Sequence, residues 1–117
     1  PLDINKGSVA WGNYRDVEFE YYTNTSKTTA TKNLGSYTRI ASGAYEGAKA
    51  NNIYDLAGNV WLWTLEADSS GSGYYRFYRG GSYHNVGTSY CASYRGSDNY
   101  PYYSYGSVGF SGRLYIK

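Results

Sequence analysis

An alternation of apolar and polar side chains predicts a half-buried strand near the start of the chain. Across residues 16–22, Val17, Phe19 and Tyr21 share one face, and acidic side chains occupy the other. A period of two is typical of a strand that covers a core with one face. The polar run 24–33, rich in Thr, Lys and Asn, predicts an exposed loop after it.

The most apolar segment lies near the middle of the chain. Residues 60–65 form an apolar run interrupted by one Thr, which indicates a strand buried on both faces. The run 68–73, DSSGSG, predicts a flexible turn. Residues 74–79 predict the next strand, and Gly80 and Gly81 end it.

Helix is expected to be scarce, and irregular segments are expected to be long. Residues 37–50 contain small side chains and two glycines, so any helix there would be short. Residues 108–110 and the alternating run 113–117 predict closing strands. Loops this long in a small domain indicate either disorder or function, and the aromatic content favours function.

Length and composition narrow the class of protein. A chain of 117 residues predicts one domain, 1–117, and because it begins at Pro1 we expect a fragment of a longer protein. With a net charge of +2 and no basic cluster, we expect no nucleic-acid partner. No apolar run is long enough for membrane insertion. The chain has 17 Tyr, too many for the core alone, because each buried hydroxyl needs a partner.

Four short sequences carry a family resemblance. They are YDLAGNVWLWT (54–64), YRGGS (78–82), ASYR (92–95) and GF (109–110). Together and in this order they resemble the C-terminal half of the formylglycine-generating enzymes, also called sulfatase-modifying factors. The resemblance implies an α+β chain with a C-type-lectin-like fold, short strands, little helix and long ordered loops.

The catalytic residues of that family are incomplete in this chain. The resemblance implies oxidation of a substrate Cys by a pair of cysteines that follow the GGS motif. Here Cys91 is the single Cys and aligns with the second of the pair, while Asn85, Val86 and Gly87 stand near the first. A copper-thiolate site needs two soft ligands. We therefore expect a non-enzyme without a cofactor, and the alternative is a degenerate oxidase with residual metal chemistry.

A calcium site that the resemblance implies is also incomplete. Relatives place Glu between the two tryptophans, where this chain has Leu62. Asp55 and the carbonyls of Gly58 and Val60 are too few oxygen ligands for a hard cation, so we expect no metal and interpret Asp55 as a turn or cap residue. His84, the single His, is interpreted as a surface contact residue.

Roles in the core or the framework are considered for five residues. Trp61 and Trp63 supply apolar volume and are expected in the core. Arg95 is expected to bind backbone carbonyls or a carboxylate through its planar guanidinium group. Cys91 is interpreted as a small, partly buried thiol. Tyr94 fits either the core or the binding site.

The segment 82–107 lacks Lys, Glu, Gln, Met and Trp. A codon AAC whose adenines change to any base encodes every residue present in this segment and none of those five. The segment therefore resembles the variable region of proteins diversified by diversity-generating retroelements, which carry a C-type-lectin fold. This resemblance implies a ligand- or receptor-binding protein of a phage or bacterium, on a virion tail or on the cell surface.

Tyr, Ser, Gly and Asn, which dominate the segment, are also the residues that antibody-like binding loops favour. We expect a protein or glycan on a target cell as the partner, and exposed Tyr rings would also support a homo-oligomer. The alternatives are a loop that merely covers a core, or a structural phage or surface domain. The predicted contact residues are Tyr83, His84, Asn85, Thr88, Tyr90, Asp98, Asn99, Tyr100, Tyr102, Tyr103 and Tyr105.

Overall fold

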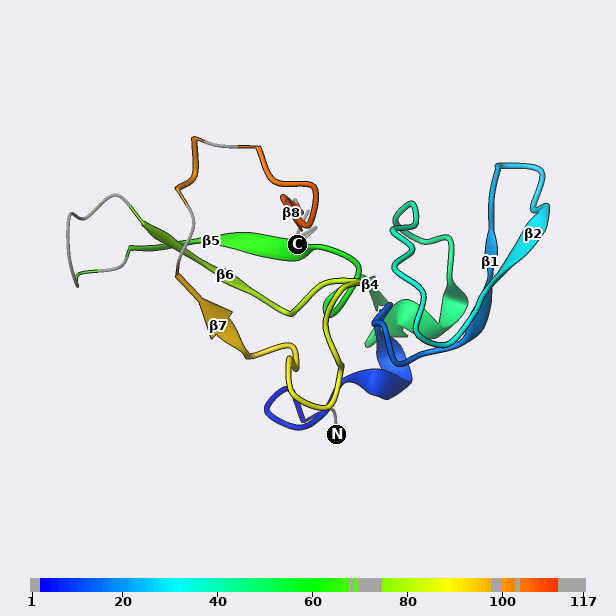
Figure 1. The fold of residues 1–117 in the computed structure, drawn as a ribbon, viewed down its shortest axis with the longest axis horizontal. Coiled ribbons are helices and arrows are strands. Elements are labelled where there is room, and N and C mark those ends of the chain that lie inside the picture. Colours follow the sequence, from blue (N-terminus) through cyan, green and yellow to red (C-terminus); the bar gives the residue numbers. More distant parts are fainter. Residues whose placement is uncertain (1–2, 68, 70–74, 98–99, 103, 112–117) are drawn as a thin grey trace.

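The computed structural model of the chain describes residues 3–67, 69, 75–97, 100–102 and 104–111 (Figure 1). These residues form short strands and two 3-10 turns, η1 (Val9–Trp11) and η2 (Glu46–Ala48), with no α-helix among them. The predicted scarcity of helix is confirmed for the described residues, and the expected poor helix in 37–50 is reduced to η2. The chain is therefore a small, mostly β domain in its described part.

The N-terminal half contains a hairpin of β1 (Phe19–Tyr22) and β2 (Thr29–Lys32). The strands are antiparallel, with Phe19 opposite Lys32. The predicted half-buried strand is confirmed, since Phe19 is 7% exposed while Glu20 faces solvent. The prediction that 24–33 is all loop is wrong, because its second half pairs with β1.

Lys32 explains why β2 was missed. Its side chain is 1% exposed, although Lys usually indicates a solvent-facing position. The ammonium group donates hydrogen bonds to the carbonyls of Tyr14 at 2.8 Å and Val17 at 2.6 Å, and it lies 5.4 Å from the Phe19 ring centroid. Burial lowers the pKa of Lys32. A buried charge is tolerated where it is hydrogen-bonded in this way.

A small apolar core lies beneath the hairpin. Phe19, Ile40 and Ala44 are buried together, and Tyr45 packs on them from the segment before η2. The rings of Phe19 and Tyr45 stack at 3.8 Å. Residues 37–50 therefore contribute to the core through single side chains on an irregular backbone.

The two halves of the chain meet at a buried pair of asparagines. Asn59 exchanges two hydrogen bonds with the backbone of Ile40, at 3.0 and 2.9 Å, and Asn13 donates to the Asn59 side chain at 3.0 Å. Gly58 has φ +71°, and a Cβ there would lie 2.6 Å from the Asn13 carbonyl oxygen. Gly58 thus allows the backbone to approach that of Asn13 closely. The hairpin of β3 (Lys49–Ala50) and β4 (Ile53–Tyr54) lies in the sequence between η2 and Gly58.

The C-terminal half is a four-stranded sheet in the order β7-β6-β5-β8. It comprises β5 (Trp61–Ala67), β6 (Arg76–Arg79), β7 (Arg95–Gly96) and β8 (Val108–Gly109). Strand β8 pairs with β5 in parallel, and the other neighbours are antiparallel. In Figure 1 the sheet lies on the opposite side of the molecule from the β1–β2 hairpin.

The strands predicted in this half are confirmed at 60–65, 74–79 and 108–110, with shifted bounds. Burial of the first on both faces is wrong, because Leu65 is 100% exposed. The pairing of β5 with β6 is irregular between Trp63 and Ala67. The strand predicted at 113–117 and most of the turn predicted at 68–73 lie outside the described residues.

Candidate binding surface

One face of the sheet is aromatic. Trp61 on β5 and Tyr78 on β6 are 8% and 7% exposed, and their rings meet edge to face at 5.0 Å. Trp63 meets Tyr78 at 5.6 Å and is only partly buried. The predicted core position is therefore confirmed for Trp61 and holds in part for Trp63. Gly96 on β7 leaves room for the Tyr78 ring, which would lie 2.5 Å from a Cβ at that position.

A cleft of about 370 Å³ opens on this face, and it is called the central cleft below. Tyr90 and Tyr94 come from the loop between β6 and β7, and their ring centroids lie 5.8 and 5.9 Å from that of Trp61. Tyr94 is 42% exposed. The central cleft is lined by Trp61, Tyr78, Tyr90, Tyr94, Gly96 and Ser97. It places Tyr90, a predicted contact residue, beside framework rings.

The N-terminal segment holds the backbone of this loop. Hydrogen bonds join residues 4–16 to main-chain atoms of residues 82–93. They are Ser8 N to Gly87 O at 2.9 Å, Arg15 N to Asn85 O at 2.9 Å, Ser93 N to Ile4 O at 3.0 Å, Gly87 N to Asp16 Oδ1 at 2.9 Å and Ala92 N to Ser8 Oγ at 3.0 Å. Because these bonds reach the backbone, they do not depend on most side chains of the loop.

Tyr14 adds a further anchor below the loop. Its side chain is fully buried, and its hydroxyl oxygen lies 2.7 Å from the carbonyl oxygens of both Gly80 and Tyr90, to which it donates. Burial raises the pKa of Tyr14. Gly81 has φ +71°, and a Cβ there would lie 2.9 Å from the Tyr14 ring. The predicted role of the two glycines as a break after β6 is confirmed.

A second aromatic group surrounds His84. The His84 ring lies 4.1 Å from the Tyr83 ring and meets the Tyr37 ring edge to face at 5.1 Å. Tyr37 is 58% exposed and belongs to the segment between β2 and η2. In the same segment Arg39 donates to the Gly106 carbonyl at 2.8 Å. Residues 37–39 therefore touch both ends of the segment 82–107.

A third group lies in the connection from β7 to β8. The rings of Tyr75 and Tyr100 are 4.5 Å apart, and their hydroxyl oxygens are 3.1 Å apart. Tyr102 follows at 5.2 Å from Tyr100 and is 68% exposed. Tyr105 is partly buried in the same connection.

The predicted contact residues thus fall into separate groups. Thr88 is exposed, as a contact residue requires. The side-chain oxygen of Asn85 instead accepts hydrogen bonds from Ser82 N and Ser82 Oγ, both at 2.9 Å, and supports the turn. Asp98, Asn99 and Tyr103 lie outside the described residues.

Sequence reasoning missed Tyr37, Arg39, Tyr75 and Tyr78 as neighbours of these groups. They lie outside 82–107, and only Tyr78 belongs to a motif, YRGGS, which was interpreted as a family signature and not as part of a binding surface. The excess of Tyr was the one available signal, because it required many rings at the surface.

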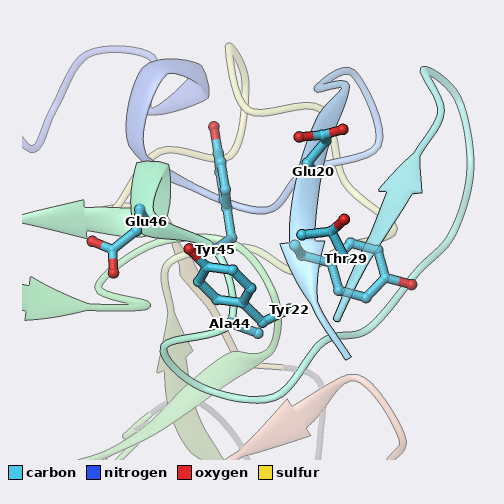
Figure 2. Close-up of a pocket in the computed structure, with 7 residues that line it drawn as sticks. Glu20, Tyr22, Thr29, Ala44, Tyr45 and Glu46 are labelled. Atoms are coloured by element: carbon cyan, nitrogen blue, oxygen red, sulfur yellow. The ribbon is translucent and has the colours of Figure 1, made fainter. Parts of the chain in front are cut away.

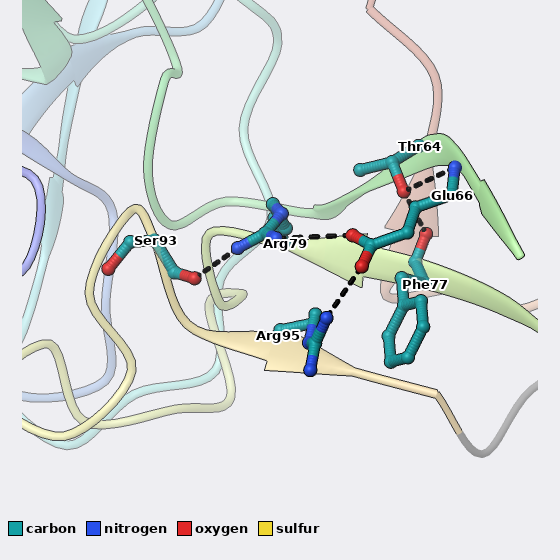
Figure 3. Close-up of polar contacts among 6 residues, drawn as sticks. All are labelled: Thr64, Glu66, Phe77, Arg79, Ser93 and Arg95. Carbon is teal, nitrogen blue, oxygen red and sulfur yellow. Dashed lines mark hydrogen bonds and ion pairs between the residues drawn. The ribbon is translucent and has the colours of Figure 1, made fainter. Parts of the chain in front are cut away.

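The opposite face of the sheet is held by charge (Figure 3). The Glu66 carboxylate lies between two guanidinium groups, 3.2 Å from Arg79 and in direct contact with Arg95. Arg79 also donates to the Ser93 carbonyl, and Arg95 lies 4.3 Å from the centroid of the Phe77 ring. The predicted structural role of Arg95 toward a carboxylate is confirmed. These contacts join β5, β6 and β7.

Residues with metal or redox potential are dispersed. Cys91 is partly buried, as predicted, with its sulfur 3.4 Å from Ser93 Oγ. Asp55 accepts from Ser42 Oγ at 2.6 Å and Gly43 N at 3.3 Å, so its carboxylate engages a turn distant in sequence and not the local turn or cap that was predicted. Among the described residues, His, Cys, Asp and Glu side chains form no group of three that could hold a metal ion. The Leu62 side chain offers no oxygen ligand.

Comparison with known proteins gives one match. A protein-family model described as a sulfatase-modifying factor enzyme 1-like domain matches residues 3–114. No curated protein and no solved structure matches the chain. In the part of the chain that the structure describes, no helix has the length and apolar character to cross a membrane.

Proposed function

This chain belongs to the sulfatase-modifying factor enzyme 1-like family, and we propose that it is a non-catalytic member with a C-type-lectin-like fold that binds a ligand through residues 82–107. The observation that carries the proposal is the way the loop between β6 and β7 is held. Its main chain is bonded to residues 4–16, while Tyr83, His84 and Thr88 project outward or lie partly exposed. Because the main chain of such a loop is already fixed, binding a ligand costs little conformational entropy.

The same arrangement supports variability of the segment. A hydrogen bond to a main-chain atom survives a change of side chain, so the fixed residues Ser8, Tyr14 and Asp16 would hold many different loop sequences. Tyr adds a large amphipathic contact area with few rotatable bonds. We propose that 82–107 is the variable region of a protein diversified by a retroelement, with its partner, a protein or glycan, on a target cell.

The composition of the locus tests this proposal. We expect a reverse transcriptase gene nearby and a second copy of the 82–107 coding sequence that differs at adenines alone. The protein would then be carried on a virion tail or on a bacterial surface. If the locus holds no such repeat, or if the repeat differs equally at all four bases, the proposed variability is wrong.

A second candidate function follows from family membership together with Cys91. This thiol is partly exposed and adjoins Tyr90 of the central cleft. A residual oxidase would bind Cu(I) through it, although the chain offers one Cys where a two-thiolate site needs a pair. Titration with Cu(I) separates the candidates. Tight binding that a Cys91→Ala substitution abolishes would replace the binding-module proposal.

A further inference from the structure

A separate cleft of about 180 Å³ lies beside the β1–β2 hairpin, and it is called the hairpin cleft below. Figure 2 shows Glu20 and Thr29 of the hairpin on one side and Tyr45 and Glu46 on the other, with Tyr22 and Ala44 next to each other between them. Its volume is below the roughly 300–1,000 Å³ of sites for drug-sized ligands. The hairpin cleft therefore has room for one small head group.

The lining combines rings with negative charge. Both charged side chains among the lining residues, Glu20 and Glu46, are acidic and exposed. Tyr21, Tyr22 and Tyr45 supply the aromatic surface. An organic ammonium ion is attracted both by carboxylates and by the negative faces of aromatic rings.

Neighbouring side chains already show this attraction. The Lys27 ammonium lies 5.6 Å from the centroid of the Tyr22 ring, and the Lys49 ammonium lies 5.5 Å from that of Tyr54. Lys27 lines an adjoining cleft that shares Tyr22 and Ala44 with the hairpin cleft, and it is absent from the lining of the hairpin cleft itself. The Tyr22 ring can therefore make cation–π contacts both with Lys27 and with a ligand in the hairpin cleft.

The hairpin cleft is also held in shape. The Tyr22 amide donates to the Ala44 carbonyl at 2.8 Å, which ties β1 to the opposite wall. Tyr45 stacks on the buried Phe19, and a Cβ on Gly47 would lie 2.2 Å from the Tyr45 ring.

From these observations we propose that the hairpin cleft binds an organic ammonium group, with Tyr22 and Tyr45 as aromatic walls and Glu20 and Glu46 as counter-charges. The site is independent of the segment 82–107, because none of its lining residues belongs to that segment. The ammonium group can come from a choline head group of a surface or from a methylated lysine of a protein.

Titration with choline, followed by NMR of the backbone amides, tests the proposal. We expect shifts at Tyr22, Thr29, Ala44 and Glu46. The neutral isostere 3,3-dimethylbutan-1-ol should bind at least fivefold more weakly, and added salt should weaken choline binding alone, because exposed charges are screened. The amide of trimethyllysine and vesicles of phosphatidylcholine then identify the source of the ammonium group.

Matched variants assign the binding to the cleft. A Glu20→Gln, Glu46→Gln double variant should weaken choline binding at least fivefold. Glu18→Gln, which removes an exposed carboxylate outside the lining, should leave it unchanged. Equal binding of choline and its neutral isostere would overturn the proposal, as would choline shifts confined to the central cleft. Circular dichroism verifies that each variant is folded, and the isostere and salt comparisons need no variant.

Discussion

At the scale of single residues, the buried hydroxyl of Tyr14 makes the sharpest prediction. Tyr14→Phe keeps the ring but removes the donor to the carbonyls of Gly80 and Tyr90. The Gly80 carbonyl keeps the Gly58 amide as a donor, so the Tyr90 carbonyl is the one that loses its partner, at a cost of about 1–2 kcal/mol. Urea unfolding should show this loss in the free energy of unfolding. Tyr37→Phe, at a 58% exposed ring, should change the free energy little, and a comparable loss there would contradict the assignment.

The same hydroxyl predicts a difference at alkaline pH. Burial raises the pKa of Tyr14 above the value of about 10 of an unfolded chain. Above pH 10 the folded chain therefore keeps a proton that the unfolded chain has lost, and stability from this group falls as pH rises. Below pH 10 its contribution is complete. The free energy of unfolding of the wild type should decline more steeply above pH 10 than that of Tyr14→Phe, and equal slopes would refute the prediction.

At the scale of elements, residues 4–16 are predicted to fix the loop between β6 and β7. Ser8 is fully buried, and its hydroxyl accepts the Ala92 amide at 3.0 Å. Ser8→Ala leaves that amide without its partner, so we expect a loss of about 1 kcal/mol and faster hydrogen exchange at Ala92. Thr88→Ala is the control, because that side chain is exposed. Unchanged exchange at Ala92 would show that the loop does not depend on this bond.

Strand β7 has only two residues, and charge contributes to holding it. Glu66→Gln weakens the ion pairs with both Arg79 and Arg95. These side chains are 38–50% exposed, so solvent screening limits the expected loss to about 0.5–1 kcal/mol. Hydrogen exchange at Arg95 and Gly96 should rise more than in Glu18→Gln. Unchanged exchange at Arg95 and Gly96 would show that β7 does not depend on these ion pairs.

At the scale of the whole molecule, sequence patterns predicted elements better than their arrangement. Alternation identified β1, and an apolar run identified β5, because those patterns reflect local burial. The same patterns failed to predict β2, because the burial of Lys32 depends on the carbonyls of Tyr14 and Val17, which are distant in sequence. Leu65 shows the opposite error, because an apolar residue predicted to be buried is 100% exposed.

The candidate surface was foreseen in part for a related reason. Amino-acid composition singled out residues 82–107, but composition does not predict which side chains lie together in space. The segment's Tyr residues form separate groups, and each group is completed by a ring from elsewhere, such as Tyr37, Trp61 or Tyr75. Asn85 looked like a contact residue by type, whereas Ser82 engages its side-chain oxygen. Such roles depend on tertiary neighbours.

If the chain is a scaffold that carries an exchangeable surface, substitutions on that surface should leave the stability of the fold nearly unchanged. A Tyr83→Ser, Thr88→Ser, Tyr102→Ser triple variant uses a residue that the same codon can encode. Thr88 and Tyr102 are exposed and Tyr83 is partly exposed, and such positions change stability by up to about 0.5 kcal/mol each, so the total loss should stay within about 1.5 kcal/mol with cooperative unfolding retained. Trp61→Ala removes a buried ring and should cost about 3–5 kcal/mol. Thermal unfolding distinguishes the two, because loss of cooperativity in the triple variant would make those rings part of the core and end the case for a binding surface there.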